Sequence, residues 1–118
     1  MTQYHPRQGQ QHPYHAIPHG FGNLVGNTML YATEAGMRHY YEQVNSGHLS
    51  DDEELWYETL FTEMPQSRGA YVEKTNSFFR EGKSQYDHHE AEFFAAIMYD
   101  RGYITTDVKK SARRDYSN

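Results

Sequence analysis

Apolar side chains recur at helical spacing in the chain from residue 27 onward. The first set falls on one helix face at spacings of seven, four and three residues and comprises Leu30, Met37, Tyr41 and Val44. The segment from Asn45 to Gly47 then supplies a stop signal. This pattern predicts a helix over residues 28–45. Gly36, inside it, is expected to permit a close crossing with another helix.

The second predicted helix has the clearest start signal. Ser50 is followed three residues later by Glu53, which is the spacing of a capping box, and the neighbouring acids complement the helix dipole. Pro65 ends the apolar stretch that follows, so the helix is predicted over residues 51–64. One face of it is bulky and apolar, and the opposite face is acidic.

Two further helices follow from capping residues and glycine stops. Ser67 is suited to cap a third helix that runs to residue 81, just before Gly82. Residues 87–90 form a capping pair for a fourth helix, whose apolar face is the strongest in the chain and which ends before Gly102. A short basic helix over residues 105–114 is predicted to complete the chain.

These elements predict an all-α fold, a compact bundle of four to five short helices in a single domain over residues 24–118. An extended arm, residues 1–23, precedes it, because three prolines there oppose any helix and the segment is rich in Gln and His. The expected core consists of Leu30, Met37, Trp56, Leu60, Phe61, Phe78, Phe93, Ile97 and Met98.

Composition narrows the class of protein further. The chain has 118 residues, the usual size of one domain, and contains no Cys, which excludes disulfides, thiolate catalysis and Cys-based zinc sites. Its longest apolar segment, residues 93–98, is far too short to cross a bilayer, and residues 1–20 lack the apolar run of a signal peptide. We therefore expect a cytoplasmic protein without membrane association, and no cofactor motif is evident.

Charge and tyrosine content favour binding over catalysis. Eleven residues are Tyr, whose large ring and hydroxyl suit contact surfaces, and residues 51–63 hold six acids and no base. The leading hypothesis is a small non-enzymatic protein, an inhibitor, adaptor or assembly component, that binds a protein partner; homo-oligomerisation is left open. Such compositions are frequent among phage and mobile-element accessory proteins. The expected partner-binding residues are Tyr40, Asp51, Asp52, Glu54, Tyr57 and Glu58.

A nucleic-acid-binding regulator is the first alternative. Residues 101–118 hold five bases against two acids. In a helix over residues 105–114, four of these bases would lie on adjacent turns of one side and could contact phosphates: Lys109, Lys110, Arg113 and Arg114. With the fourth helix, this segment would resemble a helix-turn-helix pair.

A metal-binding helical protein is the second alternative. The arm residues His12, His15 and His19 have spacings that allow convergence on a metal ion, although prolines between them oppose a helix. His88 and Glu92 would lie one helical turn apart, which also suits ligation.

Glu34 and His39 of the first predicted helix leave acid–base chemistry open. Glu34 lies between apolar positions, so it is a buried carboxyl with a raised pKa, a residue at the edge of the apolar stripe, or a partner of Arg38 on the next turn, and His39 is similarly ambiguous. No nucleophile signature or phosphate-binding loop accompanies them.

Overall fold

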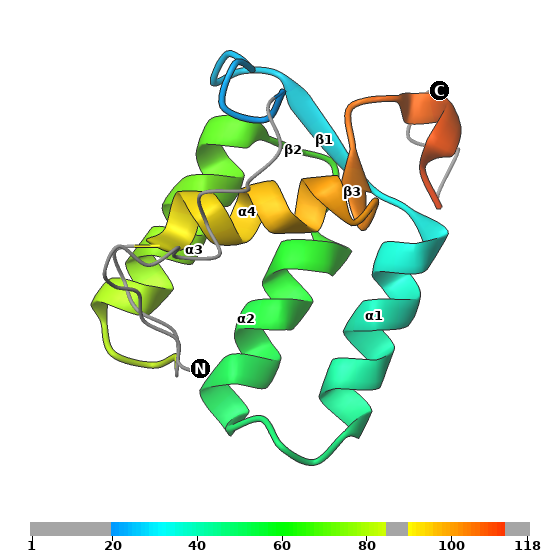
Figure 1. Ribbon diagram of the computed structural model, residues 1–118. Coiled ribbons are helices and arrows are strands. Elements are labelled where there is room, and N and C mark those ends of the chain that lie inside the picture. Colours follow the sequence, from blue (N-terminus) through cyan, green and yellow to red (C-terminus); the bar gives the residue numbers. More distant parts are fainter. Residues whose placement is uncertain (1–19, 85–89, 113–118) are drawn as a thin grey trace, which may run out of the picture.

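The computed structural model describes residues 20–84 and 90–112 and shows a helix-rich fold with a small sheet (Figure 1). The described α-helices are α1 (Glu34–Asn45), α2 (Asp51–Thr62), α3 (Arg68–Arg80) and α4 (Ala91–Asp100). The strands are β1 (Met29–Ala32), β2 (Gln66–Ser67) and β3 (Ile104–Thr105), followed by a single 3-10 turn, η3 (Val108–Lys110). The predicted arm lies outside the described residues up to residue 19.

The sheet joins the ends of three helices. Its order is β2-β1-β3 with both pairs antiparallel, so that Leu30 of β1 lies opposite Gln66 and Ala32 lies opposite Ile104. Because β1 leads into α1, β2 leads into α3, and β3 follows α4, the three helices meet at the sheet (Figure 1). The fold is therefore mostly helical, and the prediction of a purely all-α protein is wrong in this respect.

The predicted first helix is a strand in its first part. Leu30 and Ala32 are buried and their neighbours Met29 and Tyr31 are more exposed, which is the alternation of a strand. Thr33 then has extended backbone angles, and its hydroxyl accepts a hydrogen bond from the Gly36 amide at 3.0 Å. Thr33 is thus the N-cap of α1, and the helix begins at residue 34 instead of residue 28.

The predicted basic helix over residues 105–114 is also absent from the described part of the chain. Local side chains compete for its amides: the Thr105 hydroxyl accepts from the Asp107 amide at 3.1 Å, and the Asp107 carboxylate accepts from the Lys109 amide at 3.0 Å. The chain instead returns to β1, where the Ala112 amide donates to the Ala32 carbonyl at 2.8 Å. Up to residue 112, the segment therefore does not form a helix-turn-helix pair with α4.

The middle helices begin and end close to their predicted limits. The Ser50 hydroxyl accepts from the Glu53 amide at 3.1 Å while the Glu53 carboxylate accepts from the Ser50 amide at 3.0 Å, so the predicted capping box is present. The Ser67 hydroxyl caps α3 by accepting from the Ala70 amide at 3.1 Å. Gly82 and Gly102 have positive φ angles of 73° and 77° after α3 and α4, as C-terminal glycines do.

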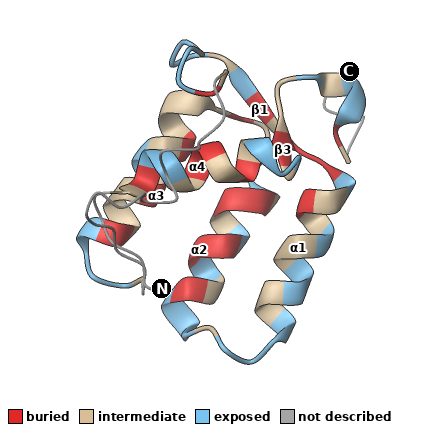
Figure 2. Cartoon of the chain, viewed as in Figure 1, coloured by how far each residue is buried: buried red, intermediate tan, exposed pale blue. Residues whose placement is uncertain are grey.

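Buried residues occur on all four described α-helices and on β1 and β3 (Figure 2), and many of those that form the core are aromatic. Trp56 stacks on Phe78 with ring centroids 5.0 Å apart and 6° between the planes, which joins α2 to α3. The largest fully buried side chains are Tyr71, Phe21, Phe61, Leu30, Leu60, Ile104 and Thr75. Most of the predicted core is at least partly buried, with Met37, Phe78 and Ile97 at its margin.

Phe93 is an exception, since it is 39% exposed and does not belong to the core. Helix α4 instead turns Ala91, Ala95 and Met98 inward, at spacings of four and three residues. These residues fall on a different face of the helix from Phe93. The large apolar side chain of Phe93 suggested a core position, but the inward face of α4 carries small side chains, which allow the helix to approach its neighbours closely.

The start of α1 and the turn after α4 are in direct backbone contact. The Thr33 hydroxyl donates to the Gly102 carbonyl, and the Thr33 amide donates to the Tyr103 carbonyl at 3.1 Å. A Cβ atom placed on Gly36 would lie 2.0 Å from that Tyr103 carbonyl oxygen and 3.1 Å from Phe61. Gly36 therefore permits a close approach, as predicted for this position, but to a turn and not to a crossing helix.

We expect Gly36→Ala to lower the free energy of unfolding by about 2 kcal/mol, because the clash with backbone outweighs the gain of about 1 kcal/mol in helix propensity. Urea denaturation measures this change. Gly22→Ala is the control, since a Cβ there meets no atom within 4 Å. A stabilised Gly36→Ala variant would show that the two segments do not touch.

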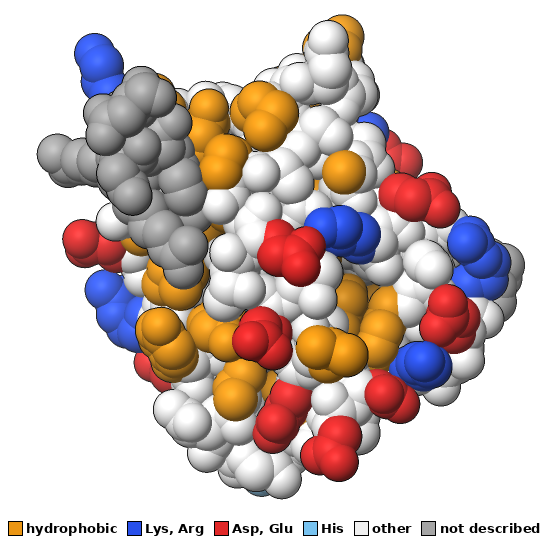
Figure 3. All heavy atoms as spheres, turned by 180° about the vertical axis from the view of Figure 1, so that it is seen from behind, with side chains coloured by type: hydrophobic (Ala, Val, Ile, Leu, Met, Phe, Trp, Pro, Cys, Tyr) orange, Lys and Arg blue, Asp and Glu red, His pale blue; other side chains and the backbone are white. Residues whose placement is uncertain are grey.

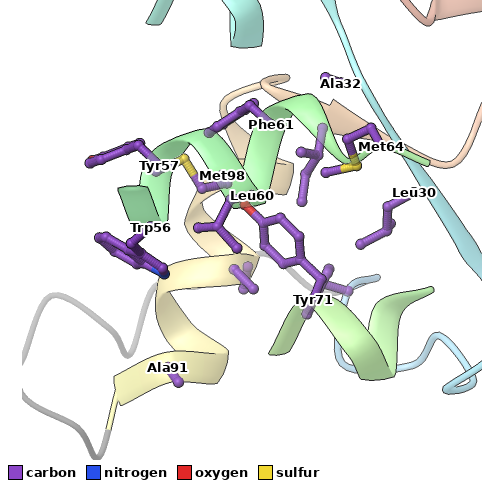
Figure 4. Packing of buried hydrophobic residues seen from close by; sticks show 14 of the residues in the cluster. Leu30, Ala32, Trp56, Tyr57, Leu60, Phe61, Met64, Tyr71, Ala91 and Met98 are labelled. Atoms are coloured by element: carbon purple, nitrogen blue, oxygen red, sulfur yellow. The ribbon is translucent and has the colours of Figure 1, made fainter. Parts of the chain in front are cut away.

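The side chain of Tyr71 reaches from α3 toward Leu60 of α2, inside the core (Figure 4). Its hydroxyl has no hydrogen-bond partner among the described residues, and burial raises the pKa of the phenol. A buried hydroxyl without a partner costs free energy, because its bonds to water are lost on folding.

We therefore expect Tyr71→Phe to raise the free energy of unfolding by about 1 kcal/mol, since it removes the buried hydroxyl and keeps the ring. Thermal and urea unfolding would measure the gain. A clear loss of stability would mean that the hydroxyl is hydrogen-bonded in the folded protein.

Candidate functional site

Helices α1 and α2 lie side by side, joined by residues 46–50, and form a strongly acidic part of the chain (Figure 1). Residues 34–62 contain seven acids and a single Lys or Arg, Arg38. Figure 3 shows acidic side chains interspersed with apolar ones over the lower half of the molecule, toward the end where this loop lies. The helix pair is thus the strongest candidate for a binding surface.

Except for the buried Glu53 of the capping box, the acids of α2 lie outside its buried face. Trp56, Tyr57 and Leu60 form the buried face, and Glu54 and Glu58, one turn apart, lie on the side next to Phe61. Glu58 is exposed and Glu54 is half-buried. Their position directs both carboxylates toward the neighbouring α1.

Tyr40 of α1 lies near enough to these carboxylates to be affected by their charge. The pKa of its phenol is raised first by burial, then by the negative charge of Glu58, the neighbouring Tyr41 and the negative charge of Glu54. The Tyr40 ring lies 4.9 Å from the Tyr41 ring and 6.1 Å from the Phe61 ring, between centroids. The structure therefore brings together three of the residues predicted for partner binding, which lie on two different helices.

We define the acidic surface as the outward part of this helix pair, formed by Tyr40, Tyr41, Asp51, Glu54 and Glu58. Within the described residues, none of its three carboxylates forms an ion pair. The lysines of α3 and its C-terminal turn lie on the other side of α2 and are paired there: the Lys74 ammonium lies 2.7 Å from the Glu63 carboxylate and that of Lys83 lies 3.4 Å from Glu81. The negative charge of the acidic surface is thus uncompensated by these lysines.

The exposure of two tyrosine side chains differs from the prediction. Tyr57 is only 2% exposed, so its ring belongs to the core and is not available to a partner. Tyr41, which the helical pattern placed on the apolar face, is 55% exposed. Helix α1 buries Gly36 and half-buries Met37, Tyr40 and Val44, so the apolar pattern was displaced by one residue at this tyrosine pair.

The remaining predicted partner-binding residue, Asp52, is exposed on the other side of α2, next to α3. Glu34 is exposed at the first position of α1, and not buried as acid–base chemistry would require.

The predicted metal site receives no support from the part of the chain that the structure describes. There, no three His, Asp or Glu side chains are grouped as metal ligands. Glu92 is exposed and pairs with Arg68, whose guanidinium carbon also lies 4.6 Å from the centre of the Phe21 ring. The histidines proposed as ligands fall outside the described residues: His12, His15, His19 and His88.

The predicted nucleic-acid face is only partly described. Lys109 and Lys110 are exposed on η3, and Arg113 and Arg114 lie outside the described residues. Because η3 is a single turn of three residues, the helical face that would have aligned four bases is not formed there.

No helix of residues 20–84 and 90–112 has both the length and the apolar character needed to cross a membrane. In comparisons with known proteins, no family model, curated protein or solved structure matched the chain.

His39 of α1 is a titratable group whose ring lies among aromatic side chains. Its ring stacks on Tyr103, with centroids 4.4 Å apart, and contacts Tyr57 and Phe61 edge-on. Its Nε2 atom is buried without a hydrogen-bond partner among the described residues. The pKa of His39 lies below its ordinary value of 6.5, chiefly because burial disfavours the charged imidazolium; Glu42 opposes this shift and Arg101 adds to it.

Because the folded protein has the lower pKa, the unfolded chain binds this proton first as the pH falls. The stability that depends on neutral His39 is therefore complete above pH 6.5 and is lost progressively below it. We expect the free energy of unfolding to fall less between pH 7 and pH 5 in His39→Phe than in the wild type. An NMR titration midpoint of the His39 ring above pH 6.5 would contradict this.

Proposed function

We propose that this protein is a small non-enzymatic interaction protein that binds a positively charged surface of another protein through its acidic surface. The observation that supports the proposal most strongly is the packing of the Tyr40 ring of α1 on Phe61 of α2, with ring centroids 6.1 Å apart, on the side of α2 that carries Glu54 and Glu58. Tyr41, 55% exposed, extends this arrangement with a second ring.

The chemistry of the acidic surface suits Lys and Arg side chains. A guanidinium or ammonium group gains from carboxylates that have no ion pair of their own, and its flat or alkyl part can pack on a tyrosine ring. Such complementarity accelerates association and selects among partners, and it weakens as salt rises. The rings supply apolar contact area at low entropic cost, because a tyrosine has few rotatable bonds.

Inhibitor, adaptor and assembly component are all roles that such a surface would serve, including those of phage and mobile-element accessory proteins. A chain without Cys also suits a reducing compartment, and we place the protein in the cytoplasm. Nucleic acid is a less suitable partner for the acidic surface, because phosphates would be repelled by the carboxylates of α2.

Charge reversal on the acidic surface tests the proposal. We expect Glu54→Lys/Glu58→Lys to reduce capture of the partner from the native cells by about tenfold or more, since two attractive contacts become repulsive. Crosslinking followed by quantitative mass spectrometry measures the captured protein, and the affinity is then measured with that protein purified.

The matched control is Glu73→Lys/Asp100→Lys, which changes the charge equally at exposed residues outside α1 and α2. It should leave capture within about twofold of the wild type. Circular dichroism establishes that each variant folds. A partner retained by the Glu54→Lys/Glu58→Lys variant, or recovery of nucleic acid instead of protein, would refute the proposal.

A further inference from the structure

An open groove of about 230 Å³ runs between α2 and the α3 side of the molecule. Trp56 and Phe78, stacked on each other, supply aromatic surface to it, and Leu55, Thr59 and Ser77 also line it. Trp56 is only 3% exposed, whereas Leu55 is 61% exposed. An almost buried indole beside an exposed leucine makes the groove apolar at its base and at one wall.

Charged side chains surround this apolar centre. Asp52, Lys74, Glu81 and Lys83 also line the groove. The two lysines pair with Glu63 and Glu81, whereas Asp52 forms no ion pair within the described residues. The rim therefore retains an uncompensated carboxylate on its α2 side.

Leu55 connects the groove with the acidic surface. On α2 it lies one turn after Asp51 and one turn before both Glu58, which belongs to the acidic surface, and Thr59, which lines the groove. The acidic surface and the groove are consequently neighbouring strips of the same helix, with Leu55 between them. A single bound segment can contact both.

We propose that the groove receives an apolar side chain of a basic amphipathic segment of the partner, whose Lys or Arg residues contact the acidic surface and Asp52. This inference rests on the proposed function and specifies the chemistry of the partner. The anchor is a Leu, Met or aromatic side chain, and the bases flank it along the segment.

The size and charge of the groove support this occupant. Sites for small organic ligands have volumes of about 300–1,000 Å³ and enclose most of the ligand, whereas this groove is smaller and open. Its volume suits one or two side chains anchored in an aromatic pocket, as in helix-in-groove recognition. The carboxylates of Asp51, Asp52, Glu54 and Glu58, which form no ion pair within the described residues, favour a basic segment.

Two synthetic peptides of about 14 residues test this inference. Both carry the same Lys residues, and one has four Leu at helical spacing where the other has Ser. We expect the Leu peptide to bind at least about tenfold more tightly, because only it can fill the groove. Trp56 is the single Trp of the chain, so its fluorescence reports directly on occupation of the groove.

Leu55→Ser should remove most of the preference for the Leu peptide, and Val25→Ser should leave it unchanged. Val25 is a matched control, since it is 64% exposed and lies outside α2 and α3. NMR spectra of the wild type should show the strongest peptide-dependent shifts at Leu55, Thr59 and Phe78.

The outcomes separate the two proposals. If both peptides bind equally and Glu54→Lys/Glu58→Lys abolishes this binding, the proposed role of the acidic surface stands and the proposed role of the groove is refuted. If neither peptide binds, the proposal of a basic partner segment is refuted for both sites. If sedimentation shows that the free protein self-associates and that Leu55→Ser abolishes this, the occupant is a second copy of the chain, and the inference is wrong.

Discussion

The architecture depends on the contact between the start of α1 and the turn that leaves α4. Thr33 donates through its hydroxyl to Gly102, 69 residues away, while the same oxygen caps α1 by accepting from Gly36. The missing side chain of Gly36 leaves room for the Tyr103 carbonyl. Because one residue serves as helix cap and long-range anchor, the orientation of α1 is coupled to the position of the sheet.

The acidic surface is a consequence of this geometry. With α1 anchored at its first turn, the helix runs beside α2, and Tyr40 comes to lie next to Glu54 and Glu58. The aromatic core below, where Trp56 stacks on Phe78, sets α2 against α3 and so forms the groove on the other side of α2. A single amphipathic helix thus contributes its buried face to stability and two outward strips to the proposed recognition.

Local signals explain which parts of the fold were predictable. The Ser50–Glu53 capping box and the Ser67 cap depend on residues three apart, so α2 and α3 could be recognised from sequence. The strands could not, because β2 and β3 are two residues long and exist only through pairing with β1. Residues 105–112 carry helix-compatible side chains, but hydrogen bonds to Thr105, Asp107 and Ala32 hold them in another conformation.

For the candidate surface, too, local properties were predictable and those that depend on packing were not. The sequence alone determined that α2 would be amphipathic and acidic and that tyrosines would be abundant, because spacing and charge are local properties. Only the tertiary structure decided which tyrosine faces outward: Tyr57 packs in the core, Tyr40 lies beside the acids and Tyr41 is exposed. A rotation of one residue about a helix axis changes these environments, and only the packing of neighbouring helices selects it, because every alternative register satisfies the same backbone hydrogen bonds.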